Sequence, residues 1–154
     1  MAARRQARAL VAEGHTCSML YIKEVDRPPD HPPILQRADQ DFVLEVPWSQ
    51  WMRHGLLTQA ATENNRSRIS TTYFSFFPVQ GPLDSLLLDA CRGFDVIHIH
   101  WIASLVSEAF LKALSQLGKR IVITSHDMNH FTGGCHYSAG CPAYQTNCNY
   151  CPQL

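Results

Sequence analysis

The sequence lacks an excess of either charge, a long apolar run and a recognisable secretion signal. Of its 154 residues, 13 are Lys or Arg and 13 are Asp or Glu, so the formal net charge is zero. Such a balance gives no basic surface for nucleic acid. No run reaches the roughly 18 apolar residues of a membrane-spanning helix, and no apolar segment follows the initial Met1-Ala-Ala-Arg-Arg. We therefore expect a cytoplasmic protein, one domain in size, that binds no nucleic acid.

Six cysteines are present, and without a secretion signal they indicate reduced thiols or metal ligands. Cys17 and Cys91 stand alone in apolar surroundings, as small buried residues do. The other four cluster near the end of the chain: Cys135, Cys141, Cys148 and Cys151. Four thiols suit a tetrahedral structural zinc, and the spacing of the last pair is typical of zinc knuckles. The alternatives are reduced thiols, disulfides, an iron–sulfur cluster, or a zinc site in which His136 replaces one thiol.

Hydrophobic periodicity predicts alternating helices and strands. The predicted helices are Ala2–Glu13, Trp48–Leu57, Leu83–Cys91 and Ser104–Leu117, and the predicted strands are Thr16–Ile22, Phe42–Val46, Thr71–Phe77, Asp95–His100 and Arg120–Thr124. Alternation of this kind favours an α/β fold with a Rossmann-like, doubly wound parallel sheet covered by helices. Functional sites in such sheets form outside the carboxyl ends of the strands.

Two of the predicted strands run directly into histidine. His100 and Trp101 follow one strand, and His126 and Asp127 follow the other. A histidine there can hydrogen-bond a hydroxyl group or a developing charge, so His126 is the first catalytic candidate. The alternative is a His–Asp pair that only caps the loop. His98 shares a strand face with His100, and we expect it to be a satisfied interior residue.

Several segments together resemble bacterial family 4 glycosyltransferases, the sugar-nucleotide-dependent enzymes of surface polysaccharide assembly. The resemblance runs from about Thr62 to Leu154 and rests on the segments Asn65–Ser75, Asp95–Ile102, Thr124–Met128, Phe131–Ser138 and Cys148–Leu154. It implies the GT-B architecture, in which two Rossmann-like domains enclose the reaction. Residues 1–154 would then be part of the amino-terminal, acceptor-side domain, with a Cys-rich loop at 131–154. The family's first strand would be missing, and its carboxy-terminal donor-binding domain absent.

The resemblance also implies roles for individual residues. His126 would lie under the transferred sugar as a catalytic residue, with Asp127 either orienting it or binding an acceptor hydroxyl. His100 and Trp101 would line the acceptor cleft, where the Trp101 ring would stack on a sugar. Gly133 and Gly134 would let the backbone come close to the acceptor pocket. The alternative for these two glycines is a plain turn.

The implied substrates are a nucleotide-sugar donor and a glycan or lipid-linked acceptor, and catalysis would need no metal or other cofactor. Because the donor site would lie in the second domain, we expect the chain alone to be inactive. A basic helix face formed by Arg4, Arg5 and Arg8 would allow a peripheral contact with the inner face of the membrane.

Two other functions stay open at this point. One is a metal-dependent hydrolase whose ligands and base would come from His98, His100, His126, Asp127 and His130. The other is a non-enzymatic module in which a loop held by zinc contacts other proteins. The chain could also be an incomplete gene product without independent function.

Overall fold

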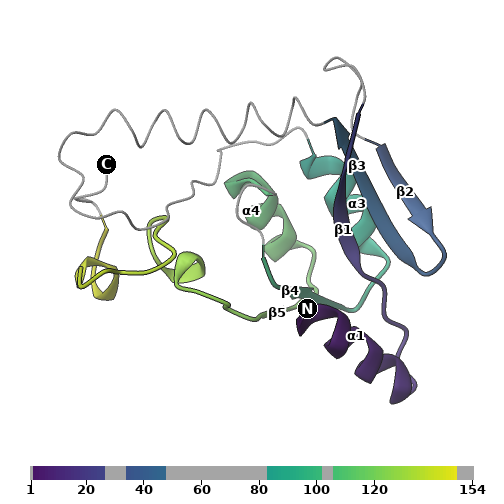
Figure 1. The fold of residues 1–154 in the computed structure, drawn as a ribbon, viewed down its shortest axis with the longest axis horizontal. Coiled ribbons are helices and arrows are strands. Elements are labelled where there is room, and N and C mark those ends of the chain that lie inside the picture. The colour runs from purple at the N-terminus through teal and green to yellow at the C-terminus, as the bar shows by residue number, and fades with distance from the viewer. Residues whose placement is uncertain (1, 27–33, 48–82, 102–105, 149–154) are drawn as a thin grey trace. The chain divides into compact units, whose positions relative to one another are not determined.

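The computed structural model describes residues 2–26, 34–47, 83–101 and 106–148. The chain divides into two compact units, Met1–Arg53 and His54–Leu154, which are described separately. Within the described residues both contain α-helix and β-strand (Figure 1). The α/β class predicted from the sequence is therefore confirmed.

The first unit contains a three-stranded sheet. It consists of β1 (Leu20–Val25), β2 (Ile34–Ala38) and β3 (Asp41–Pro47), with β3 in the middle. β1 runs parallel to β3, whereas β2 is antiparallel to it. The β2–β3 turn contains Asp39 with a φ of 55°. This is a left-handed conformation, which Asp tolerates better than most residues.

The middle strand, β3, provides the core of this unit because it has a neighbour on each side. Its buried apolar residues are Val43, Leu44 and Val46. Glu45 is buried as well, and its carboxylate accepts hydrogen bonds from Lys23 Nζ at 3.4 Å and Gln36 Nε2 at 3.2 Å. Each neighbouring strand thus contributes one donor, which compensates the cost of burying this charge.

Helix α1 (Ala2–Ala12) precedes the sheet, and the turn that follows it contains Gly14, the predicted stop. Gly14 has a φ of 87°, and the N–H of His15 reaches back to the carbonyl of Leu10 at 3.0 Å, as at many glycine-terminated helices. On the predicted basic face, Arg4 lies with its guanidinium 5.9 Å from the centre of the Tyr21 ring. Contact of this face with an anionic membrane stays a prediction.

The second unit contains α3 (Asp84–Arg92), β4 (Val96–Ile99), α4 (Glu108–Gln116) and β5 (Arg120–Ile123). β4 and β5 are parallel and paired, and α3 packs against α4. The buried apolar side chains of this unit include Leu83, Leu87, Ile99, Val106, Phe110 and Leu114. All four elements lie within or close to the predicted ranges.

Helix α4 begins at Glu108, later than the start predicted at residue 104, although residues 102–105 are outside the described part. Its N-cap is Ser107, whose Oγ accepts a hydrogen bond from the Phe110 N–H at 3.0 Å. The same hydroxyl donates to Asp84 Oδ2, in the first turn of α3. One buried serine therefore both caps α4 and links it to α3.

The finer prediction of one doubly wound, Rossmann-like sheet is not confirmed. The described strands form two sheets, and the antiparallel edge strand β2 was not predicted at all. β1 begins at Leu20 instead of residue 16, because its pairing starts only where β3 begins, opposite Phe42. The helix, loop and strand predicted over residues 48–77 lie outside the described residues.

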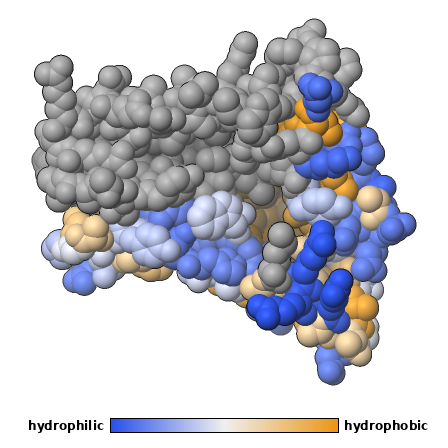
Figure 2. All heavy atoms as spheres, in the orientation of Figure 1, coloured by the Kyte–Doolittle hydropathy of each residue, from blue (hydrophilic) through white to orange (hydrophobic). Residues whose placement is uncertain are grey.

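The described surface mixes hydrophilic side chains with scattered apolar ones, as the face in Figure 2 shows. In β5 the apolar residues Ile121, Val122 and Ile123 are 37%, 46% and 51% exposed, whereas a doubly wound sheet buries both faces. A search of the described residues for a helix long and apolar enough to cross a membrane found none.

Candidate functional site at the carboxyl ends of β4 and β5

The two histidine-bearing segments lie side by side, because β4 and β5 are parallel neighbours. Their pairing continues one residue past the strands, where the Thr124 N–H donates to the Ile99 carbonyl at 2.9 Å. His100 and His126 therefore project from the same edge of the sheet. This edge is where α/β sheets commonly bind ligands.

Three imidazole rings form a row at this edge, which we call the histidine row: His98, His100 and His126. The ring centres of His98 and His100 are 4.3 Å apart, and those of His100 and His126 are 5.3 Å apart. His100 Nδ1 lies 3.0 Å from His126 Nε2, so one of these nitrogens donates and the other accepts. His98 Nε2 is paired with Thr124 Oγ1 at 2.8 Å.

The prediction that His98 is an interior residue is wrong. Its side chain is exposed, because along β4 the buried residue is Ile99 and the residues on the other face stay open. His98 is nevertheless satisfied, through Thr124. The His98 side chain thus lies at the exposed carboxyl edge of the sheet and is not part of the core.

The pKa of His100 is lowered. Burial is the main cause, and the positive charges that His98 and His126 carry when protonated lower it further. His100 is therefore mostly neutral at physiological pH and can accept a proton or a hydrogen bond. His100 therefore has the chemistry of a weak base.

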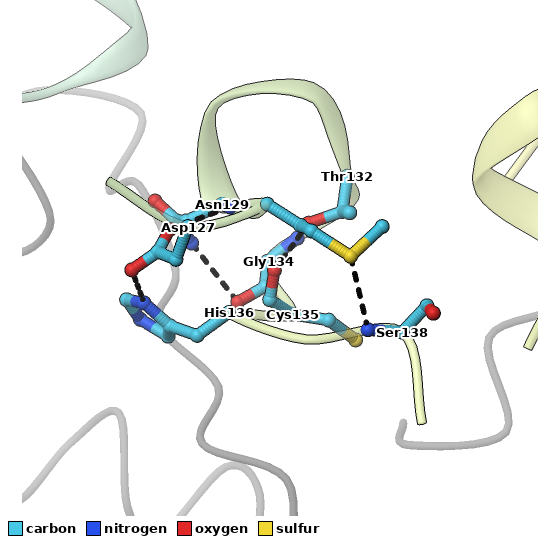
Figure 3. Close-up of polar contacts among 8 residues, drawn as sticks. Asp127, Asn129, Thr132, Gly134, Cys135, His136 and Ser138 are labelled. Carbon is cyan, nitrogen blue, oxygen red and sulfur yellow. Dashed lines mark hydrogen bonds and ion pairs between the residues drawn. The ribbon is translucent and has the colours of Figure 1, made fainter. Parts of the chain in front are cut away.

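Asp127 engages His136, nine residues further along the chain. Asp127 Oδ2 lies 2.7 Å from His136 Nδ1, and Oδ1 accepts from the Asn129 N–H at 2.8 Å (Figure 3). A carboxylate has no proton to donate, so Nδ1 carries the hydrogen of the first contact. The contact with Asn129 N–H is the loop-capping role that the sequence left open for Asp127.

The Asp127–His136 pair is almost completely buried, with side chains 6% and 2% exposed. Burial by itself would raise the pKa of Asp127. The hydrogen bonds from His136 and the Asn129 N–H, with the charges of His136 and His130, outweigh it and lower the pKa. Asp127 is thus a fixed carboxylate at neutral pH.

A network of hydrogen bonds closes the loop around this pair (Figure 3). The Met128 N–H donates to the carbonyl of His136 at 2.9 Å, and Asn129 Nδ2 donates to the carbonyl of Gly134 at 3.0 Å. The Gly134 N–H in turn donates to Thr132 Oγ1 at 3.3 Å. The loop therefore has a defined shape of its own.

The Gly-Gly turn depends on both glycines. Gly134 is buried and has a φ of 135°, a conformation that side-chain-bearing residues rarely adopt. A Cβ on Gly133 would lie 3.0 Å from Cys148 Cβ, a tighter contact than most, so Cys148 would have to shift slightly. The place of these two glycines beside an acceptor pocket stays a prediction.

The predicted zinc site is only partly covered by the described residues. Cys135, Cys141 and Cys148 are half-buried, and Cys151 lies outside the described part. Among the residues described, no three His, Cys, Asp or Glu side chains are arranged to hold a metal. These residues therefore do not by themselves fit a zinc ion, and the four-thiol site stays a prediction.

Trp101, predicted to line the acceptor cleft, stacks on His136. The ring centres are 4.9 Å apart and the planes are inclined by 18°, while 51% of Trp101 is exposed. Sequence reasoning had considered His136 only as a substitute zinc ligand. The available signal was its position across the Gly-Gly turn from Asp127, which brings the two side chains together.

Comparisons with protein-family models, with curated proteins and with solved structures gave no match for this chain.

Proposed function

We propose that this chain is the acceptor-side, Rossmann-like part of a family 4 glycosyltransferase with the GT-B fold. In this proposal it binds a glycan or lipid-linked acceptor, which receives a sugar from a nucleotide-sugar donor in the cytoplasm. The motif resemblance suggests the class. The observation that carries the proposal is the hydrogen-bonded pair His100–His126 at the carboxyl edge of two parallel strands.

The pair suits a transfer in which an acceptor hydroxyl bonds to the anomeric carbon of the donor sugar, its proton is taken up, and the nucleoside diphosphate leaves. A neutral imidazole can accept the proton of an attacking hydroxyl or donate to an oxygen that develops charge. The contact with His100 restricts the rotation and the tautomer of His126, which prepares it for one such role. In the proposal His126 acts at the reacting sugar, and His100 holds it in place.

The hydrolase alternative has less support. His98, His100 and His126 do lie together, but the carboxylate of Asp127 is committed to His136 and Asn129. The described residues also lack a three-ligand group arranged for a metal. We therefore retain sugar transfer as the function that the site supports best.

The test uses the chain itself and NMR of its histidine and tryptophan side chains. Methyl glycosides of glucose, galactose and mannose serve as acceptor probes, and UDP-glucose serves as a donor probe. We expect a glycoside to shift the His126 signals, and a His126→Ala variant to bind it more weakly. His15→Ala, in the other unit, is the matched control.

We also expect no sugar transfer by the chain alone, because the resemblance places the donor site in a second domain. Turnover of UDP-glucose by the purified chain would contradict the placement of the donor site in a second domain. If none of the three glycosides perturbs His126, the acceptor-side assignment is wrong.

A further inference from the structure

The stack of Trp101 on His136 has an asymmetry that a simple packing contact would not require. His136 is 1% exposed, yet the Trp101 ring that it supports is 51% exposed. A large aromatic ring is thus held flat against a buried partner while much of its surface faces outward. Rings held in this way bind the apolar C–H face of a sugar, since the face of an aromatic ring carries negative charge density.

His136, on which Trp101 stacks, is itself held in place by the loop. Asp127 binds His136 Nδ1 at 2.7 Å, and the carboxylate is itself fixed by the Asn129 N–H at 2.8 Å. The backbone of His136 is also held, because its carbonyl accepts from the Met128 N–H at 2.9 Å. The loop contacts of Asp127 and Met128 therefore fix His136, and His136 in turn holds the indole ring of Trp101 in place.

We propose that Asp127 and His136 are positioning residues that hold Trp101 as a stacking platform for a pyranose ring. This inference rests on the proposed function and assigns to Asp127 a task other than catalysis or a direct bond to the acceptor. The occupant is a sugar that presents several C–H groups on one face, such as β-glucose or β-galactose.

The energetic advantage comes from order that exists before binding. A side chain that becomes immobilised only when the ligand binds loses conformational entropy, which reduces affinity, whereas a side chain that is already fixed has no such cost. The stack on His136 already restricts the rotation of the Trp101 side chain. Loosening the stack should therefore weaken sugar binding even where the indole itself is unchanged.

The experiment measures the dissociation constant of methyl β-D-glucopyranoside and methyl β-D-galactopyranoside for the full chain. The readout is the indole N–H signal of Trp101, assigned by its loss in Trp101→Phe. For Trp101→Ala and Trp101→Phe, where no indole remains at this position, shifts of neighbouring amides are used. Removing one aromatic contact of this kind should weaken binding about fivefold, and Trp101→Phe should restore part of it.

Asp127→Asn tests the positioning role. It leaves the indole in place but weakens its support, and we expect about a threefold loss of affinity together with a shifted, broader indole signal. Tyr137→Ala is the matched control, because Tyr137 is an exposed aromatic residue (63%) of the same loop and is not part of the stack. It should bind both glycosides as the unaltered chain does.

If Asp127→Asn unfolds the loop, the double variant Asp127→Asn/His136→Phe keeps the inference testable. Phenylalanine provides a ring under Trp101 that needs no carboxylate, so this variant should bind at nearly the original strength. The inference is overturned if Trp101→Ala binds like the unaltered chain, or if Tyr137→Ala loses as much affinity.

The outcomes also separate this inference from the proposed function. Glycoside binding that shifts His126 but is insensitive to Trp101→Ala would refute the platform alone. Binding that depends on Trp101 but leaves His126 unaffected would refute the catalytic assignment of the histidine row while supporting the platform.

Discussion

His100 and His126, which follow two different strands, share a hydrogen bond of 3.0 Å between Nδ1 and Nε2. Because one hydrogen serves both nitrogens, the contact is lost when both rings are fully protonated. His98, with its ring centre 4.3 Å from that of His100, adds a third group that can become positively charged. The site should therefore respond to mild acid.

The first prediction concerns stability between about pH 7 and pH 5. An unfolded histidine has a pKa of about 6.5, and the pKa of His100 in the folded chain is lower, first because of burial and then because of its neighbours. The unfolded chain thus takes up the proton first. The free energy of unfolding should fall as the pH drops below about 6.5 and continue to fall until it passes the lowered pKa.

His100→Gln should make this fall shallower, as measured by urea unfolding of the second unit at several pH values. His15→Gln removes an exposed histidine of the first unit and is the control. An identical pH profile for His100→Gln and the unaltered chain would mean that the histidine row does not resist protonation.

The second prediction concerns Asp127, whose pKa is lowered by its hydrogen bonds in spite of burial. Its stabilising contribution is present above the unfolded pKa of about 3.9 and is lost as the pH falls through the lowered value. At pH 7, Asp127→Asn should cost about 2 kcal/mol, the usual contribution of a hydrogen bond to a charged group. Hydrogen exchange of the Met128 and Asn129 amides measures this cost within the loop.

Asp39→Asn is the matched control, because Asp39 is an exposed turn residue in the other unit and asparagine also tolerates its positive φ. We expect it to leave both amides unchanged. Equal protection of these amides in Asp127→Asn and the unaltered chain at neutral pH would show that the Asp127–His136 contact contributes nothing to the loop.

The helices were predictable because residues close in the sequence determine where they form and end. The apolar repeat of α4 and the glycine after α1 determine helices with little help from the rest of the chain. Pairing was harder to predict: β1 starts at Leu20 because Phe42 lies opposite it, and nothing in residues 16–22 reveals this. β2 carries polar residues such as Gln36 and Arg37 because it lies at a sheet edge.

The same division applies to the candidate site. The sequence placed His100 and His126 each at the end of a strand, and their contact was found only in the structure, where β4 and β5 are neighbours. The partner of Asp127 was not predicted either, since it depends on the unusual backbone of Gly134 and on the hydrogen bonds that close the loop. A linear motif places Asp127 beside His126, and only the folded loop carries its carboxylate to His136.

The third prediction concerns the N-cap of α4. Ser107 is fully buried, accepts from the Phe110 N–H and donates to Asp84. Ser107→Ala should therefore lower the free energy of unfolding by about 2 kcal/mol, the upper end for a lost N-cap. Ser115→Ala, in the same helix, removes an exposed hydroxyl that donates to the Lys112 carbonyl and should change stability little. Similar urea midpoints for the two variants would contradict the linking role of Ser107.

The fourth prediction concerns the four thiols. If Cys135, Cys141, Cys148 and Cys151 bind a structural zinc, protein purified without added metal should contain one zinc per chain by elemental analysis. Cys141→Ser should lower that content, whereas Cys91→Ser, outside the cluster, should not. A content near zero in the unaltered protein would favour free thiols.

The last prediction concerns the Gly-Gly turn. Gly134 has a φ of 135°. Alanine there would be strained by about 1–3 kcal/mol, and the strain would fall on the turn whose carbonyl accepts from Asn129 Nδ2. Gly134→Ala should therefore reduce hydrogen-exchange protection at Met128 and weaken the Trp101 stack. Gly93→Ala is the control, since Gly93 has an ordinary φ of −76° and open space around its Cα. Full protection in Gly134→Ala would show that the turn can adopt another backbone, and that the Asp127–His136 contact does not depend on this glycine.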